Sequence, residues 1–238
     1  MVLAVFAAAA MGSESEIGVD HGVFDAFLVG SFRGRGVDYA VLASRRPLLD
    51  RYLADVAAVP PIPATGDAAV ALAINAYNAC TLRIVLDHPG LGSIRDLGDA
   101  SVWKSPRCEV EGKVWTLDNL ERQRVLGPLG GEGHAVVNCA SRGCPPLPTA
   151  AFRAKGLAVQ VDAAVSRWLG SNAFSRTPGG LSVSAIFDWY SADFASDLNV
   201  QGLSKQDVAK KWLAVRGVDV AGVTSVEFAP YDWGINSP

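Results

Sequence analysis

One histidine and two cysteines lie close together in the segment GHAVVNCASRGCPPL, residues 133–147, of a chain that has only three His and four Cys. A thiol nucleophile requires a base that removes its proton and hydrogen-bond donors for the oxyanion that forms on the substrate carbonyl. His134 can serve as the base, and Cys139 or Cys144 as the nucleophile. The segment therefore predicts a thiol active site.

Other polar side chains near this segment in sequence could complete such a site. The carboxylate of Glu121 could orient the imidazole, and an amide of Asn75, Asn78 or Asn138 could orient it or donate to the oxyanion. Arg142 adjoins the second cysteine of the loop, where a cation favours the thiolate. We assign the three asparagines and Arg142 to substrate binding or to the oxyanion.

The alternation of side chains discriminates between the two cysteines. If HAVVNC forms a regular buried strand, His134 and Asn138 share one face and Cys139 points to the other. Cys144 follows a turn and could return to the face of the histidine. This alternation favours Cys144 as the nucleophile. If the strand bulged just before Cys139, the side chain of Cys139 would turn to the face of the histidine, and Cys139 could be the nucleophile instead.

Structural roles for the sulfurs are the main alternative. Cys139 and Cys144 could form a short-loop disulfide in an exported protein, and the chain would then be a non-catalytic binding or scaffolding module. A zinc site at His134 lacks a clear fourth ligand, so we expect no metal. Cys80 and Cys108 have no polar neighbours and are expected in the core.

The elements that position these residues follow from hydrophobic periodicity. The apolar run from Ala68 to about His88 predicts a core helix with Asn75 and Asn78 on one face, so something polar must meet their amides. A hairpin turns at Glu111-Gly112, and the next helix carries Glu121. Before this core helix, the sequence predicts two helices within residues 20–59. After the cysteine segment, it predicts an amphipathic helix within 150–171 and a strand running into an aromatic-rich helix within 179–194. A capped helix within 204–217 and a last strand after 223 complete the chain. The fold class is α+β, mainly helical with a small antiparallel sheet.

Composition limits the range of functions. Half of the 238 residues are apolar and 19% are charged, which is typical of a globular protein. The net charge of −3 comes from scattered residues, so nucleic acid is not expected as a partner. No segment approaches the roughly 18 to 20 apolar residues of a transmembrane helix, so no stable membrane span is expected. The opening MVLAVFAAAAM is similar to the apolar part of a secretory signal without its basic start, which predicts export. We predict a signal-peptide remnant or disordered start at 1–19, an N-terminal helical segment at 20–66 and a core domain at 67–238.

Four motifs in a fixed order resemble the bacterial members of the domain of unknown function 547 family: INAYNACTLRIVLDHPGLGSIRDLG, LDNLE, HAVVNCASRGCPPL and LSVSAIFDWYSADF. The resemblance implies a rearranged papain-type thiol hydrolase with a Glu-His-Cys triad and no cofactor. Its residues here would be Glu121, His134 and one of the two loop cysteines, and its substrate a peptide or small amide. The chain departs from the usual pattern at Ala73, where a bulky aromatic residue commonly precedes IN.

Overall fold

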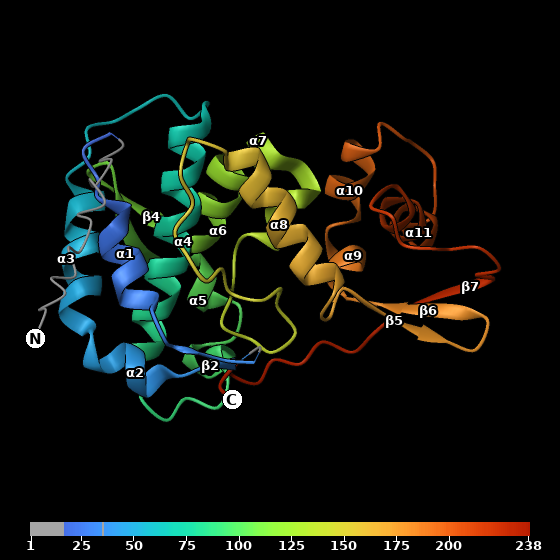
Figure 1. Ribbon diagram of the computed structural model, residues 1–238, viewed down its shortest axis with the longest axis horizontal. Coiled ribbons are helices and arrows are strands. Elements are labelled where there is room, and N and C mark those ends of the chain that lie inside the picture. Colours follow the sequence, from blue (N-terminus) through green and yellow to red (C-terminus); the bar gives the residue numbers. More distant parts are fainter. Residues whose placement is uncertain (1–16, 35) are drawn as a thin grey trace, which may run out of the picture.

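The longest helix, α4 (Asp67–Asp87), runs through the core of the computed structural model, which describes residues 17–34 and 36–238 (Figure 1). It is apolar nearly all round, as the sequence predicts, and it packs against α3, β3 and the helical turns that follow residue 120. Among the described helices, α4 alone has the length and hydropathy of a membrane span, but 89% of its most apolar window is buried inside the protein. The predicted signal remnant falls mainly on residues 1–16, outside the described residues.

The N-terminal helices cover one side of α4. They are α1 (His21–Leu28), α2 (Tyr39–Ser44) and α3 (Arg46–Ala57), and the short strands β1 (Phe32–Arg33) and β2 (Gly36–Val37) form a hairpin between the first two. The sequence predicts two helices here, and the structure has three. Pro47 explains the difference, because it has no N–H to continue α2 but is favoured in the first turn of α3.

A hairpin covers another side of α4. Helical turns η1 (Ile94–Leu97) and α5 (Ser101–Lys104) lead into β3 (Pro106–Val110) and β4 (Lys113–Thr116). The predicted turn is confirmed, since Glu111 and Gly112 both have positive φ, as a type I′ turn requires.

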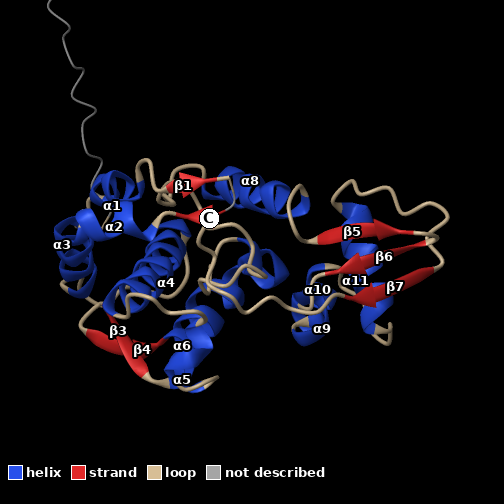
Figure 2. Cartoon of the chain, turned by 90° about the horizontal axis from the view of Figure 1, so that it is seen from below, coloured by secondary structure: helices blue, strands red, loops and turns tan. Residues whose placement is uncertain are grey.

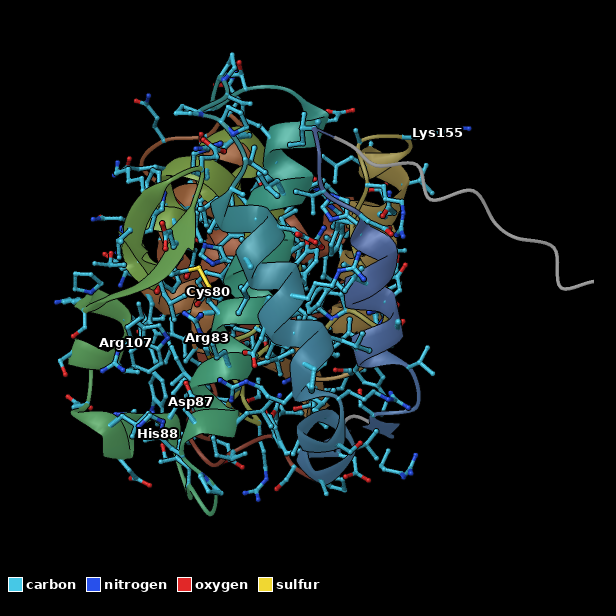
Figure 3. The ribbon with its side chains drawn as sticks, turned by 90° about the vertical axis from the view of Figure 1, so that its left-hand side faces the viewer. Cys80, Arg83, Asp87, His88, Arg107 and Lys155 are labelled. Atoms are coloured by element: carbon cyan, nitrogen blue, oxygen red, sulfur yellow. A yellow bond between two sulfur atoms is a disulfide. The ribbon has the colours of Figure 1, made fainter. Side chains whose placement is uncertain are left out.

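Cys80 and Cys108 are fully buried, as predicted for core residues, but they also form a disulfide, which was not predicted. The bond joins α4 to β3 (Figure 3). The two cysteines are separated by 28 positions, and connectivity across such a distance cannot be deduced from sequence alone.

The prediction that HAVVNC forms a strand is wrong. The chain passes from α6 (Leu117–Leu120) through a π-helix, η2 (Glu121–Leu126), and α7 (Gly127–Leu129) into a 3₁₀ helix, η3 (Gly130–Ala135), and continues without strand pairing. Asn78 of α4 takes the place of a neighbouring strand: its Nδ2 donates to the carbonyl of Val136 at 2.9 Å, and its Oδ1 accepts the N–H of Asn138 at 2.9 Å. The buried backbone is satisfied by a side chain, which hydrophobic periodicity does not reveal.

The chain continues through α8 (Leu157–Leu169), which lies in the middle of the molecule (Figure 1). The elements that follow α8 lie toward the end opposite α1 and α3 (Figures 1 and 2). They are β5 (Phe174–Thr177), β6 (Gly180–Val183), α9 (Ile186–Trp189), α10 (Ser191–Asp197), α11 (Lys205–Val215) and β7 (Ser225–Phe228). The sheet order is β5-β6-β7; β5 and β6 are antiparallel, but β6 and β7 are parallel. The α+β class is confirmed, and this sheet is mixed where an antiparallel one is predicted.

Candidate functional site

Four of the predicted site residues line one cavity of about 440 Å³. Glu121 comes from the first turn of η2, His134 from η3, and Cys139 and Cys144 from the loop that follows. The cavity is closed by residues from α4, α5, α9 and the C-terminal segment. Residues that are far apart in the sequence therefore meet at one opening, as a catalytic site requires.

His134 is placed between two carboxylates. Its side chain is only 3% exposed; Nε2 lies 2.9 Å from Oδ2 of Asp193, and Nδ1 lies 3.7 Å from Oε1 of Glu121. The first distance is that of a hydrogen bond and the second is longer than one. The ring of Tyr190 lies against the imidazole, with the centroids 4.3 Å apart. Asp193, and not Glu121, makes the hydrogen bond that fixes the ring.

Asp193 and Tyr190 were not among the predicted site residues. Both belong to the motif LSVSAIFDWYSADF, for which the sequence predicts a strand running into an aromatic-rich helix. The two residues are three apart at the start of α10, so they face the same way and reach His134 together. That spacing is the signal that could have found them.

Glu121 lies in an environment that disfavours its charge. Burial raises the pKa of its carboxyl, and the neighbouring imidazole of His134 and a hydrogen bond with Tyr77 lower that pKa only in part. Burial also raises the pKa of Tyr190 to about 12. A carboxyl with a raised pKa in a cavity beside a histidine is a common feature of functional sites, and π-helical turns such as η2 often occur at such sites.

Cys139 and Cys144 form a disulfide, the pairing expected if the sulfurs are structural. The backbone N–H of Cys139 donates to Sγ of Cys144 at 3.0 Å, and the hydroxyl of Tyr231 lies 3.3 Å from Sγ of Cys139. The alternation that favoured Cys144 does not apply, because the segment before the loop is not a strand. All four cysteines of the chain are paired in this state.

Asn138 holds the cysteine loop from within. Its Nδ2 donates to the carbonyl of Pro145 at 2.7 Å, and its Oδ1 accepts the N–H of Ala140 at 2.8 Å. Ala140 has a φ of 64°, a left-handed conformation that costs free energy for any residue but glycine and so needs such support. A second bond to Oδ1 comes from Nδ2 of Asn236, at 3.1 Å.

The C-terminal segment is paired along the other side of the loop. The N–H groups of Arg142 and Gly143 donate to the carbonyls of Gly234 and Asp232, at 2.8 and 2.9 Å. In return, the N–H of Asn236 donates to the carbonyl of Ala140 at 2.9 Å. Residues 232–236 thus act as a strand for the loop that carries both sulfurs.

The remaining predicted residues lie away from the cavity that holds His134. The amide of Asn75 exchanges two hydrogen bonds of 2.8 Å with the backbone of Phe152, and that of Asn78 is occupied by the backbone at 136–138. Arg142 and Asn138 line a second cavity of about 270 Å³ on the other side of the cysteine loop. The predicted need for polar partners of the two helix asparagines is confirmed, and those partners are backbone groups.

Comparison with known families assigns the central part of the chain. Residues 63–169 match the model of a protein family of unknown function, DUF547. This matched region is similar to the family, and it covers less than half of the chain. It extends from the linker before α4 to the end of α8, so it contains Glu121, His134 and both loop cysteines, while Asp193 lies beyond it. No curated protein and no solved structure matches the chain.

Proposed function

We propose that the protein is a cysteine-dependent hydrolase that cleaves a peptide or amide bond when the Cys139–Cys144 disulfide is reduced. The observation that carries the proposal is the cavity itself, in which both sulfurs, an oriented imidazole and a buried carboxyl with a raised pKa meet. A histidine base that is held by a carboxylate, with sulfur in the same opening, is the usual composition of a thiol active site. A rearranged papain-type architecture is part of this proposal.

The two carboxylates take different roles in the proposal. Because Asp193 accepts a hydrogen bond from Nε2 of His134, the proton sits on that nitrogen and Nδ1 is left as the base. Once Nδ1 has taken a proton, the imidazolium lies between Asp193 and Glu121, whose charge stabilises it. Asp193 therefore replaces Glu121 as the group that orients the ring.

Cys144 is the sulfur that we propose as nucleophile. The N–H of Cys139 already donates to this sulfur, and a hydrogen bond to the charged form favours a thiolate. Before the reaction, a small dithiol must supply two electrons and two protons to break the S–S bond, and it becomes a disulfide itself. Cys139 is then the thiol that re-forms the disulfide.

The reaction then proceeds in two steps. The Cys144 thiol gives its proton to His134, and the thiolate attacks the substrate carbonyl, so that a C–S bond forms and the C–N bond breaks. His134 returns the proton to the departing amine. Water then attacks the thioester, with His134 as base, and releases the acid and the free thiol.

The test is hydrolysis of a mixed peptide and amide library by the protein with and without a dithiol reductant. We expect activity only after reduction, and a loss of about 10³-fold or more in Cys144→Ala and in His134→Ala. His88→Ala is the matched control, because His88 lies at the end of α4 outside the cavity. If Cys144→Ala, Cys139→Ala and His134→Ala all keep the wild-type rate, the proposal is wrong.

The second candidate is a non-catalytic binding or scaffolding module, and the disulfide in the cavity wall favours it. Labelling with iodoacetamide after brief reduction separates the two functions. A thiol that labels rapidly near pH 6, and slowly once His134 is replaced, indicates an activated nucleophile. Slow labelling that is the same in both proteins indicates structural sulfurs.

We also propose that the protein is exported. Its two disulfides support this, because such bonds persist in oxidising compartments and are rare in the cytosol. The expected partner is a peptide or small amide, with no nucleic acid and no cofactor involved.

A further inference from the structure

An aromatic wall forms one side of the cavity that holds His134. It consists of Trp103, Trp189, Tyr231 and Trp233, from α5, α9 and the C-terminal segment. The rings contact one another in a chain: Trp189 stacks on Trp233 with centroids 5.6 Å apart, Tyr231 lies 4.5 Å from Trp233, and Trp103 lies 5.8 Å from it. Three tryptophans at one small cavity give it a large apolar surface.

The wall is fixed to the cysteine loop. The hydroxyl of Tyr231 lies 3.3 Å from Sγ of Cys139, and its ring lies against Gly143, where any Cβ would come within 2.9 Å of ring carbons. The guanidinium of Arg95 lies over the ring of Trp233, 4.8 Å from its centroid. The rings are thus held in place before a ligand arrives, which reduces the entropic cost of binding.

Trp189 is the ring that is left for a ligand. It is 46% exposed although it lines a cavity, and most large aromatic side chains of the described residues are buried. A flat apolar ligand that stacks on Trp189 would remove the exposed ring surface from water, which is favourable.

A single unpaired cation lies at the same cavity. Lys104 lines it, and no carboxylate of the described residues lies within 4.0 Å of its ammonium group. The other basic residue of the lining, Arg122, is paired with Asp118 at 3.0 Å. Lys104 is therefore available to a ligand anion.

We infer that the cavity takes an amide whose amine side is an aromatic amino acid with a free carboxylate, the aromatic ring against Trp189 and the carboxylate near Lys104. A volume of about 440 Å³ suits one such residue and the acyl group attached to it. This inference rests on the proposed hydrolase function, since it names the substrate class of the same site. The product amine would be a free aromatic amino acid.

Binding to the oxidised protein tests the inference separately from hydrolysis, because the disulfide form has no thiol. The probes are N-acetyl-phenylalanine, its neutral amide and N-acetyl-alanine, and affinity is measured by calorimetry and by tryptophan fluorescence. We expect N-acetyl-phenylalanine to bind at least about tenfold more tightly than either of the other two.

Variants of two cavity residues sharpen the test. Trp189→Ala should weaken N-acetyl-phenylalanine at least about tenfold, whereas Trp189→Phe keeps a ring and retains most of the affinity. Lys104→Gln should remove the preference for the acid over its amide, and Lys113→Gln, on the hairpin outside the cavity, should leave that preference intact. Circular dichroism of each variant checks its fold.

Two results would overturn the inference: equal binding of the phenylalanine and alanine probes by the wild type, or unchanged binding by a folded Trp189→Ala variant. Selective binding without any hydrolysis after reduction would support the inference on ligand class and contradict only the hydrolase proposal. Hydrolysis after reduction without any preference for aromatic ligands would support the hydrolase proposal and contradict the inference on ligand class.

Discussion

The two disulfides of this chain lie in contrasting surroundings. Cys80–Cys108 is completely buried between α4 and β3, beside the hairpin whose turn carries an internal ion pair of Glu111 with Arg124. Cys139–Cys144 lies in the wall of a cavity, in a loop only five positions long. The first bond joins α4 to a strand of the hairpin itself, and the buried charges nearby, Glu111 and Arg124, are paired with each other. The second adds little chain constraint and adjoins an imidazole between carboxylates, which is an arrangement suited to chemistry.

The largest effect is expected in the core region, from Glu111→Ala. Arg124 and Glu111 are both almost fully buried, so removal of one partner leaves an uncompensated charge, which costs about 3 to 5 kcal/mol. Denaturant titration measures the free energy of unfolding. The control is Asp87→Ala, at the end of α4 (Asp87 is labelled in Figure 3). This change breaks the exposed pair with Arg46 and should cost less than about 1 kcal/mol. If both variants lost a similar amount of free energy of unfolding, the interpretation that Glu111 and Arg124 neutralise each other in the core would be contradicted.

The next effect is the loss of each disulfide. Loop-closure entropy gives about 3.5 kcal/mol for a bond across 28 positions and about 2 kcal/mol for one across five. Replacing Cys80 and Cys108 together by alanine should therefore destabilise the protein more than replacing Cys139 and Cys144 together, as judged by denaturation without reductant. The reverse order would show that the cavity disulfide is the main structural bond.

A smaller difference is expected in the rates of reduction. A thiolate reaches the cavity disulfide without unfolding, whereas Cys80–Cys108 must wait for the core to open. In a dilute dithiol, Cys139–Cys144 should be reduced at least about tenfold faster, which alkylation and peptide mass mapping can follow. Simultaneous reduction of both bonds would remove the distinction between them.

The smallest effect concerns pH. Burial raises the pKa of Glu121 above its unfolded value, so the folded state holds the proton more tightly. The stabilisation is complete below the unfolded pKa and is lost as the pH rises through the folded pKa. Relative to the wild type, Glu121→Gln should therefore gain free energy of unfolding as the pH rises above the unfolded pKa of a glutamate, about 4.3. Glu109→Gln, at an exposed position of β3 outside the cavity, is the control substitution. A gain that is independent of pH would contradict this explanation.

Local rules predicted much of the fold. The apolar period of α4, the Glu111-Gly112 turn and the Ser204 cap of α11 each depend on neighbouring residues alone, and each prediction is confirmed. The failures depend on long-range contacts. HAVVNC has the composition of a strand, but Asn78 satisfies its backbone, and the sequence does not reveal that partner.

The candidate site was predicted only in part for the same reason. Glu121, His134 and both loop cysteines meet, as their types suggested. Asp193, which makes the hydrogen bond to the imidazole, lies 59 positions after it, in a segment that reads as aromatic core. Asn138 was expected to contact the substrate. Its amide instead makes hydrogen bonds to the backbone of the cysteine loop, in which Ala140 has a positive φ.

Residues 232–236, which pair with the cysteine loop, have a consequence for biosynthesis. The loop adopts its shape only when a segment about ninety positions later is present, so the wall of the cavity is among the last parts to form as the chain emerges. Until then, Cys139 and Cys144 lack the backbone that sets their separation, while Cys80 and Cys108 can already meet. The two sulfur pairs are thus expected to close in order along the chain, the core pair first.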